Sequence, residues 1–443
     1  MKKKPILCPY TLGGINYKNG FVTSCPQQSD YLYVIDNDYR PSKIINSEGF
    51  RAHRKEMMSG IWSKGCHLCK EAEEINSNSM RQDLEGFQFN LDYYDELTGK
   101  IDLQSVFHAE LRFSNSCNMA CLHCADVFSS GWESKLKHYK TDDEDEHHQL
   151  IQLMRIFHKK PNTNYSISVS MDQMKDIVND LNKNFPNICK VDFTGGEVLH
   201  QKQFYPCLEL LSKHPNAKNL EVTFHTNFNA KFNEKRLAEL LNLFGTATMH
   251  ISIDAGTNIY SYFRSGSWDT LQKNIESFKK INNNCTINAV CTTSAYQIMD
   301  IENIFRSLIE LDFNYITSSI VYTPNYLNPA LMKINFPTET ELDIDNTIKF
   351  LQKENSRRFK NLEKYKKLRS WKEVDYGFTD ITSAINGLNK IKNYVFNKSV
   401  KHSEWDAFMV YIKKTDKIWK QSFNEHMKNY KFTGTEIIRV NNE

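Results

Sequence analysis

The sequence lacks any apolar run long enough to cross a bilayer, and it lacks the features of a secretory signal peptide. Its first ten residues, MKKKPILCPY, are basic but contain neither an apolar segment of signal-peptide length nor a small-residue cleavage site. We therefore expect a cytoplasmic protein that does not associate with a membrane.

A strong charge imbalance is also missing. The chain has 56 Lys and Arg residues against 53 Asp and Glu residues, so its formal net charge is +3, and the composition gives no sign of nucleic-acid binding. There is no internal repeat and no Gly/Ser linker. A length of 443 residues with 40% hydrophobic and 25% charged residues is typical of a globular protein with one large α/β barrel or two to three domains.

The sequence does contain an odd number of cysteines, eleven, and they are unevenly distributed. Seven lie in the first 124 residues as two groups, namely Cys8, Cys25, Cys66 and Cys69, followed by Cys117, Cys121 and Cys124. In a reducing compartment, clustered cysteines are more often metal ligands than disulfide partners. The other four, Cys189, Cys207, Cys285 and Cys291, lie in apolar or strand-like surroundings and are expected to be buried small hydrophobic residues.

Residues 105–325 alternate short strand-like segments with longer helix-like segments. Strands are expected at 106–114, 189–196, 220–227, 248–256, 286–293 and 315–323, which are rich in Val, Ile, Phe, Tyr and Thr. Helices are expected at 170–185, 234–244, 268–281 and 299–311, where apolar residues recur at three- and four-residue spacing. This alternation predicts an α/β fold with a parallel sheet, whose chemistry lies on loops at the carboxyl ends of the strands. The acidic stretch at 140–166 is interpreted as a solvated insertion, and 330–443 as mostly helical, including 406–430.

The loop CNMACLHC, residues 117–124, directly follows the first of these strands. One interpretation is a zinc site with His123 as the fourth ligand, but structural zinc usually takes two ligand pairs from separate turns. Three thiolates instead suit an iron–sulfur cluster in which one iron stays open for an exogenous ligand. An open iron is needed when the cluster binds and reduces a cofactor.

The C-x3-C-x2-C spacing, together with motifs that follow in the same order, resembles the radical S-adenosylmethionine (radical SAM) enzymes. FTGGEV (193–198) is similar to their Gly-Gly-Glu motif, HTNF (225–228) to Thr-Asn-Gly, and ISIDAG (251–256) to their ribose-contacting motif. YFRSGSWDTLQKNI (262–275) resembles the arginine-containing turn before the next helix. Two positions depart from the family pattern, because Val198 replaces a proline and Phe228 replaces a glycine.

This resemblance implies an S-adenosylmethionine site. Its expected residues are Gly195, Gly196, Glu197, Asn227, Ser252, Asp254 and Arg264. Gly195 and Gly196 would let the backbone approach the cofactor, and Glu197 would accept a hydrogen bond from the methionine amino group. Ser252 and Asp254 would bind ribose hydroxyls, and Arg264 would pair with the methionine carboxylate, although a structural role for Arg264 is about as plausible. No residue that acts on the substrate is predicted.

The four amino-terminal cysteines form two pairs, CPYTLGGINYKNGFVTSC (8–25) and CHLC (66–69). The first resembles half of a SPASM or twitch domain, in which Gly20 would form a tight hairpin that brings Cys8 and Cys25 together. Four thiolates are the number that a closed 4Fe–4S cluster needs, so a second, auxiliary cluster is expected. The same spacing also fits a structural zinc site with four cysteine ligands.

These features predict a partial (β/α)6 TIM-type barrel at 105–325, preceded by a small cluster-binding domain at 1–104 and followed by a helical region at 326–443. The resemblance implies reductive cleavage of S-adenosylmethionine to a 5′-deoxyadenosyl radical that abstracts hydrogen from a substrate, most plausibly a peptide or protein. It also implies an electron donor such as flavodoxin or ferredoxin. The alternatives are a radical SAM enzyme that modifies a nucleotide or another small molecule such as an antibiotic, and a non-catalytic iron–sulfur or zinc binding module.

Overall fold

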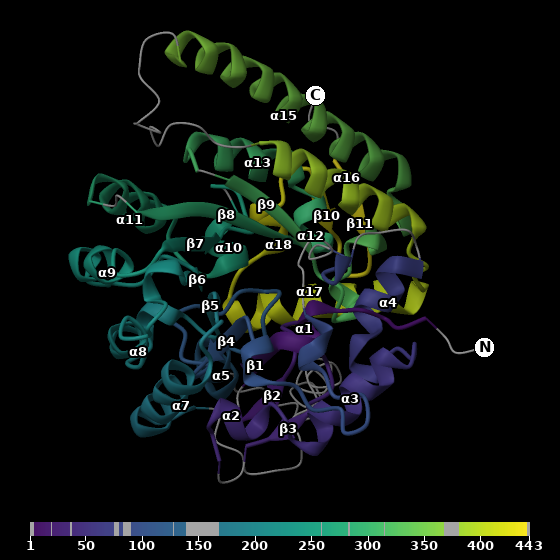
Figure 1. The fold of residues 1–443 in the computed structure, drawn as a ribbon. Coiled ribbons are helices and arrows are strands. Elements are labelled where there is room, and N and C mark those ends of the chain that lie inside the picture. The colour runs from purple at the N-terminus through teal and green to yellow at the C-terminus, as the bar shows by residue number, and fades with distance from the viewer. Residues whose placement is uncertain are drawn as a thin grey trace.

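The computed structural model describes residues 4–440, apart from 19, 36–37, 75–78, 83–89, 127, 139–167, 258, 282–283, 314 and 367–380. The insertion predicted at 140–166 lies outside the described residues. Figure 1 shows a twisted sheet with a row of helices on its outer side, and further helices from the end of the chain beyond the last strand.

One nine-stranded sheet, in the order β3-β2-β1-β4-β5-β6-β7-β8-β9, organises the chain. Its last six strands all pair in parallel, and they are β4 (His108–Arg112), β5 (Lys190–Thr194), β6 (Glu221–Thr226), β7 (Thr246–Ser252), β8 (Cys285–Thr293) and β9 (Tyr315–Ile320). They coincide with the six strands predicted from the sequence. The predicted α/β fold with a partial TIM-type barrel is therefore confirmed.

Helices connect these parallel strands and lie on the outer face of the sheet (Figure 1). The helices on the outer face are α7 (Met171–Asn184), α8 (Phe204–Leu211), α9 (Glu234–Leu241), α11 (Trp268–Ile281) and α13 (Ile301–Glu310). Three shorter helices, α5 (Ser130–His138), α10 (Tyr260–Arg264) and α12 (Ala295–Ile298), come after β4, β7 and β8 in the chain. Their boundaries follow local sequence signals, as at α7, where Ser170 and Gln173 form a capping box. The apolar stripe of each helix is buried against the outer side of the strands, which places the main core between the two layers.

The amino-terminal segment adds three strands to the barrel sheet. They are β1 (Gly14–Lys18), β2 (Phe21–Thr23) and β3 (Tyr33–Val34), and β1 pairs in parallel with β4. Gly20, at a φ of +94°, lies between β1 and β2, which pair as an antiparallel hairpin, so the predicted hairpin is confirmed. The helical elements of this segment are α1 (Pro9–Gly13), α2 (Pro41–Ile44), α3 (Glu48–Met58), η1 (Lys64–Cys66), α4 (His67–Glu74), η3 (Leu91–Tyr93) and η4 (Leu103–Ser105).

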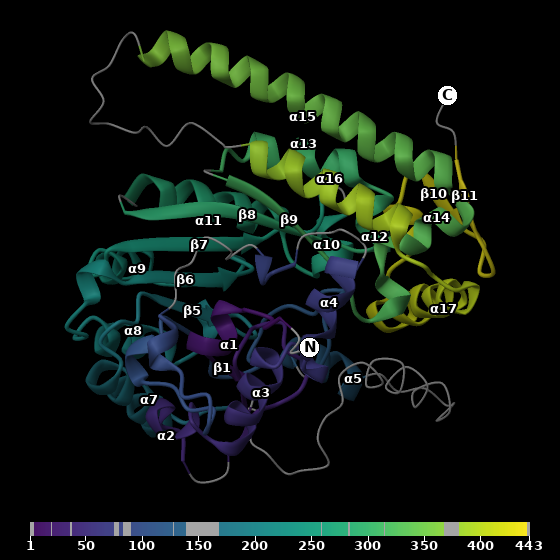
Figure 2. The same cartoon turned by 45° about the vertical axis from the view of Figure 1, so that its right-hand side comes forward.

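The carboxyl-terminal region is mainly helical, as predicted, and lies beside the last strand and the mouth of the barrel (Figure 2). It comprises η7 (Asn325–Leu327), η8 (Pro329–Leu331), α14 (Met332–Asn335), α15 (Pro337–Lys366), α16 (Thr382–Asn397), α17 (His402–Trp419) and α18 (Phe423–His426). Two further short helices, η5 (Val198–His200) and η6 (Ala217–Asn219), belong to the barrel. The strands β10 (Tyr430–Phe432) and β11 (Ile437–Arg439) form a hairpin that the sequence did not predict.

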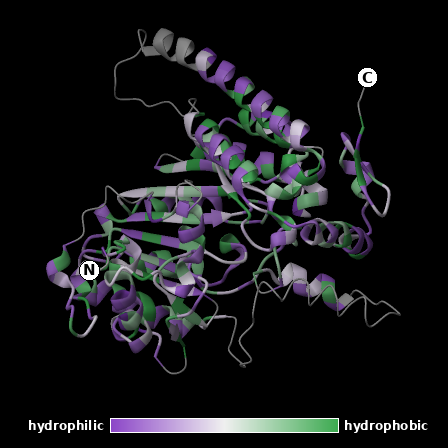
Figure 3. Cartoon of the chain, turned by 90° about the vertical axis from the view of Figure 1, so that its right-hand side faces the viewer, coloured by the Kyte–Doolittle hydropathy of each residue, from purple (hydrophilic) through white to green (hydrophobic). Residues whose placement is uncertain are grey.

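One detail of the predicted helical region is wrong. A single helix was expected over 406–430, but α17 ends at Trp419 because Lys420 takes a left-handed conformation, with φ at +53°. Its amide then bonds the carbonyl of Asp416, which satisfies the end of the helix. The long helix α15 is mostly hydrophilic (Figure 3), and no helix in the described part of the chain is long and apolar enough to span a bilayer.

Candidate active site

The three-cysteine loop leaves the carboxyl end of β4, as predicted, and its backbone is held by neighbouring side chains. The Cys117 amide donates to Ser130 Oγ at 3.0 Å, and the Cys121 carbonyl accepts from Trp132 Nε1 at 2.8 Å. Within the loop, the Cys124 amide bonds the Cys121 carbonyl at 2.9 Å. These hydrogen bonds hold the backbone of the loop in place.

The thiols of this loop lie in a low-dielectric environment. Burial raises the pKa of Cys121 to about 12, and it also raises the pKa values of Cys117 and Cys124. Without a bound cation these thiols are therefore protonated at neutral pH. Metal binding would have to displace those protons, so occupancy by a metal centre would increase with pH.

The two glycines after β5 pack directly against this loop. Gly195 and Gly196 have positive φ values of +88° and +50°. A Cβ on Gly196 would lie 2.1 Å from the Ser116 carbonyl oxygen, and one on Gly195 would lie 2.1 Å from Arg112 Cγ. Both the conformation and the close approach require glycine here. The observed neighbours of these glycines are the Arg112 side chain of β4 and the backbone of residues 114–116, which leads into the cysteine loop.

Replacing Gly196 with alanine is expected to displace the cysteine loop and to lower the iron bound after anaerobic reconstitution. Gly434→Ala is the matched control, because Gly434 also has positive φ, +97°, but a Cβ there would have no atom within 4 Å. Both variants carry the backbone strain of about 1–2 kcal/mol, so only Gly196→Ala should lose iron. Equal iron content in the two variants would contradict the packing role.

Glu197 directly follows Gly196 in the loop after β5, and it is completely buried. Its Oε1 accepts hydrogen bonds from Thr226 Oγ1 at 2.6 Å and from the Leu199 amide at 3.0 Å, and its Oε2 accepts from the Asn227 amide at 2.6 Å. Burial raises the pKa of Glu197, although these three donors oppose the rise. No described Lys, Arg or His side chain forms an ion pair with this carboxylate, and its Oε2 has room for a further donor.

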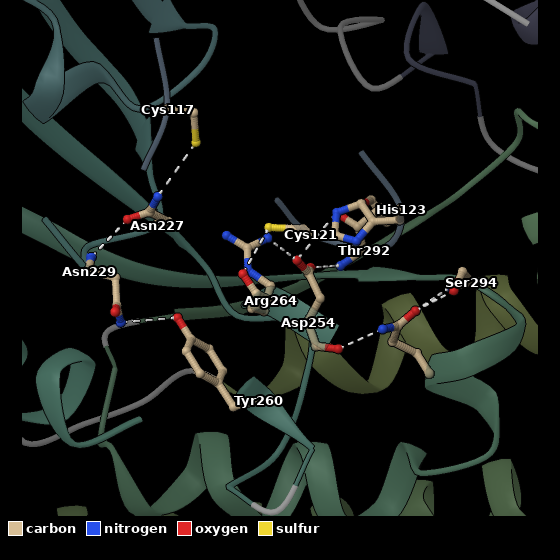
Figure 4. Close-up of polar contacts among 12 residues, drawn as sticks. Cys117, Cys121, His123, Asn227, Asn229, Asp254, Tyr260, Arg264, Thr292 and Ser294 are labelled. Atoms are coloured by element: carbon tan, nitrogen blue, oxygen red, sulfur yellow. Dashed lines mark hydrogen bonds and ion pairs between the residues drawn. The ribbon is translucent and has the colours of Figure 1, made fainter. Parts of the chain in front are cut away.

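Asn227 links the end of β6 to the cysteine loop. Its Nδ2 donates to Asn118 Oδ1 at 2.8 Å and lies 3.9 Å from Cys117 Sγ (Figure 4). The next residue, Phe228, has a φ of +52°, which explains why the resembling family places glycine there. In this chain the phenylalanine tolerates the strained backbone because its ring is fully buried against Phe232 and Phe278.

A buried ionic network lies on the other side of the cysteine loop. The guanidinium of Arg264, the last residue of α10, donates through Nη1 to Asp254 Oδ2, and the Arg264 carbonyl lies 3.5 Å from Cys121 Sγ (Figure 4). Asp254 also accepts from the Thr292 amide at 2.6 Å, and His123 Nε2 lies 3.5 Å from it. The Arg264 Nε is buried without a hydrogen-bond partner among the described residues. A donor in this state is well suited to an incoming anion.

The structure therefore brings most of the predicted cofactor residues together around Cys117, Cys121 and Cys124. Ser252 ends β7 and forms no hydrogen bond with the other predicted site residues in the described part of the chain. His123, considered as a zinc ligand, lies against Asp254 and stacks on Phe263 at 5.1 Å. Across the described ranges, no three His, Cys, Asp or Glu side chains are arranged to hold a single metal ion.

The four amino-terminal cysteines line one pocket, together with Tyr10, Met57, Trp62 and Arg81 among others. Cys8 directly precedes α1, and Cys25 follows β2. Cys66 ends η1, and Cys69 lies in the first turn of α4. Burial raises the pKa of Cys66 to about 12 and raises those of Cys8 and Cys25, and the neighbouring cysteines add to each rise. The predicted grouping of these four residues is thus present. Their role as metal ligands stays a prediction.

Sequence reasoning missed the support that the carboxyl-terminal helix gives to the cysteine loop. The Tyr411 hydroxyl, on α17, donates to the Leu122 carbonyl, and both groups are buried. Trp419 of the same helix packs edge-on against Trp132 at 4.2 Å. No local signal could have revealed these contacts, because Tyr411 and Leu122 are 289 positions apart.

Comparison with known proteins agrees with this geometry. Residues 111–308 match the family model of the radical SAM superfamily, and this range contains the cysteine loop and every residue predicted to bind the cofactor. These residues therefore form a radical SAM domain within the chain. No curated protein matches the chain at a significant level.

Two solved structures illustrate the similarity. The structure of anSMEcpe with bound AdoMet is 18% identical, with coverage of 57% of this chain and 61% of that chain and a TM-score of 0.38. SuiB of Streptococcus suis bound to S-adenosylmethionine is 14% identical, with coverage of 63% and 52% and a TM-score of 0.32. This chain thus spans less than two thirds of either protein.

Proposed function

We propose that this protein cleaves S-adenosylmethionine reductively at a 4Fe–4S cluster held by Cys117, Cys121 and Cys124, and abstracts a hydrogen atom from a peptide or protein. The observation that carries the proposal is the convergence of three clustered thiols with a buried carboxylate, Glu197, and a buried guanidinium, Arg264. When bound, the cluster and S-adenosylmethionine supply the one-electron chemistry.

The donor set of the cysteine loop fits such a cluster. Three thiols leave one iron without a protein ligand, which is the arrangement that an iron-bound cofactor requires. The loop is fixed from below by Ser130 and Trp132 and from the side by Gly196. The protein's part is then to hold the thiolates in place and to keep water from the cofactor.

The two ends of the methionine part of the cofactor have complementary groups. Glu197 offers a buried anionic oxygen for the ammonium group, and the free Nε of Arg264 offers a donor for the carboxylate. Asp254 orients Arg264 by accepting a hydrogen bond from its guanidinium, and its other carboxylate oxygen accepts from the Thr292 amide. A ribose hydroxyl that binds Asp254 would therefore donate to an oxygen that already accepts one hydrogen bond. Ser252 ends β7, where its hydroxyl would bind ribose, and Asn227 borders Cys117.

The proposal includes a second 4Fe–4S cluster on Cys8, Cys25, Cys66 and Cys69. Their spacing resembles twitch-type domains, and all four line one pocket. The competing proposal, a zinc ion, needs four tetrahedral thiolates at about 2.3 Å from one centre. Elemental analysis separates the two.

Anaerobically reconstituted protein is expected to bind about eight irons and no zinc, since each 4Fe–4S cluster holds about four. The double variant Cys66→Ser/Cys69→Ser should retain about four irons and still bind S-adenosylmethionine, because these residues lie outside the radical SAM domain. The control is Cys285→Ser, which changes a buried cysteine of β8 outside both groups. Stoichiometric zinc with about four irons in the unmodified protein would contradict the second cluster.

The peptide part of the proposal rests on the resemblance of the amino-terminal spacing to SPASM and twitch enzymes. Among the structurally similar proteins, SuiB has been solved bound to the precursor peptide SuiA. The proposed electron donor is a flavodoxin or ferredoxin. A short precursor-peptide gene beside this gene would favour peptide maturation over modification of a nucleotide or another small molecule.

The function is tested by supplying dithionite and S-adenosylmethionine to the reconstituted protein under anaerobic conditions. Release of 5′-deoxyadenosine, even without substrate, is expected. An intact cluster with no release would instead support a non-catalytic binding module.

A further inference from the structure

The inner face of the barrel sheet is polar along its whole width. On alternate positions the strands carry His108, Glu110 and Arg112 of β4, Lys190, Asp192 and Thr194 of β5, Thr223 and His225 of β6, Thr248 and His250 of β7, and Asn288 of β8. The intervening residues, such as Leu111, Phe193 and Phe224, are buried in the core on the outer face. Several of these polar residues, among them His108, Glu110 and Asn288, are buried.

Two neighbouring residues on this face have buried polar atoms without hydrogen-bond partners among the described residues. Asn16 of β1 is 0% exposed, and neither its Oδ1 nor its Nδ2 is hydrogen-bonded. Glu110 is 2% exposed, and its Oε2 has no hydrogen-bond partner. Asn16 and Glu110 are paired in register in adjacent parallel strands, so their side chains lie side by side on the same face. Leaving three such atoms unsatisfied is costly.

The charge of this pair is already balanced. Glu110 Oε1 accepts from Thr194 Oγ1, and Arg112 Nη2 lies 3.4 Å from the same oxygen. Asp192, opposite Glu110, bonds His108 Nε2 at 2.8 Å and lies 3.8 Å from Lys190 Nζ. The facing carboxylates thus each have a cationic or histidine neighbour, which disfavours a further full charge of either sign.

Lys18, the charged residue of β1 on this face, already has hydrogen-bond partners. Lys18 Nζ donates to the Pro26 and Gln28 carbonyls, at 2.5 Å and 3.0 Å. The free hydrogen-bonding capacity at Asn16 and Glu110 is therefore one donor nitrogen, with two N–H groups, and two acceptor oxygens. An uncharged primary carboxamide matches this set, because it offers one carbonyl acceptor and two N–H donors.

We propose that Asn16 and Glu110 form a subsite for an uncharged primary carboxamide side chain of the substrate. Asn16 Nδ2 donates to the amide carbonyl, Asn16 Oδ1 accepts from the amide nitrogen, and Glu110 Oε2 accepts a further N–H. The subsite deepens the proposed function, since it lies on the strand that ends at the cysteine loop. Its binding can nevertheless be measured without turnover.

The test is calorimetric titration of reconstituted full-length protein without reductant or S-adenosylmethionine. The probes are N-acetylglutamine N-methylamide, its glutamate analogue and its arginine analogue. We expect the glutamine probe to bind at least about tenfold more tightly than the charged probes. Asn16→Leu should weaken the glutamine probe about tenfold, the change that corresponds to about 1.4 kcal/mol.

The matched control is Glu221→Gln, because Glu221 lies on the same face but is already bonded to Lys190 and Thr223. It should leave probe affinity unchanged. Asn16→Leu should also raise the midpoint of thermal unfolding, since it removes an unsatisfied buried amide. A higher midpoint with unchanged probe affinity overturns the subsite, as does absence of saturable binding or equal binding of the three probes. Failure to release 5′-deoxyadenosine would refute the proposed function and leave these binding results standing.

Discussion

Replacing Cys121 with alanine is expected to abolish release of 5′-deoxyadenosine from S-adenosylmethionine under reducing conditions. Cys121 is the buried thiol of the loop, and it lies beside Arg264 in the network that would hold the cofactor. A loop with two thiols cannot hold three irons of a cluster, so the electron cannot reach the cofactor. Product is measured by chromatography after anaerobic incubation with dithionite.

Cys207→Ala is the matched control for this experiment. Cys207 is also fully buried, in α8, but it belongs to neither cysteine group. The control should keep both the product and about eight irons. The triple variant of Cys117, Cys121 and Cys124 should retain only the irons of the second cluster, about four. Product release by Cys121→Ala equal to that of the control would exclude the cysteine loop as the site of chemistry.

Replacing Glu197 with glutamine is expected to weaken S-adenosylmethionine binding roughly ten- to a hundredfold. The buried carboxylate would form a charge-assisted hydrogen bond with the ammonium group, worth about 1.5–3 kcal/mol, and each 1.4 kcal/mol is about tenfold. The cysteine loop should keep its iron, because Glu197 is not a proposed iron ligand. Affinity is measured by titration and iron content in parallel.

The structure adds a stability effect to this substitution. Both carboxylate oxygens accept protein hydrogen bonds, so a glutamine NH2 would face a donor such as the Asn227 amide. We expect a loss of about 1–3 kcal/mol in the free energy of unfolding. Thr226→Val removes one donor to Glu197 without changing its charge, and it serves as the control. It should lower stability while leaving affinity nearly unchanged, and equal affinity losses in both variants would reduce Glu197 to a structural role.

Most of the barrel could be predicted from the sequence. Strand and helix signals are local, because alternating or helical spacing of apolar residues reflects which face each element buries. The segments at 106–114, 189–196 and 220–227 therefore coincide with β4, β5 and β6. The cysteine loop and Gly195–Glu197 were also predictable, since strand ends in a parallel sheet meet at one edge.

The sequence by itself thus determined the barrel, the position of the three thiols and the hairpin at Gly20. Only the tertiary structure decided that β1 joins the barrel sheet and places Asn16 beside Glu110. Only it decided that α17 supports the cysteine loop through Tyr411. Pairing of β1 with β4 and docking of α17 depend on contacts between segments far apart in the chain, and local spacing carries no information about such contacts.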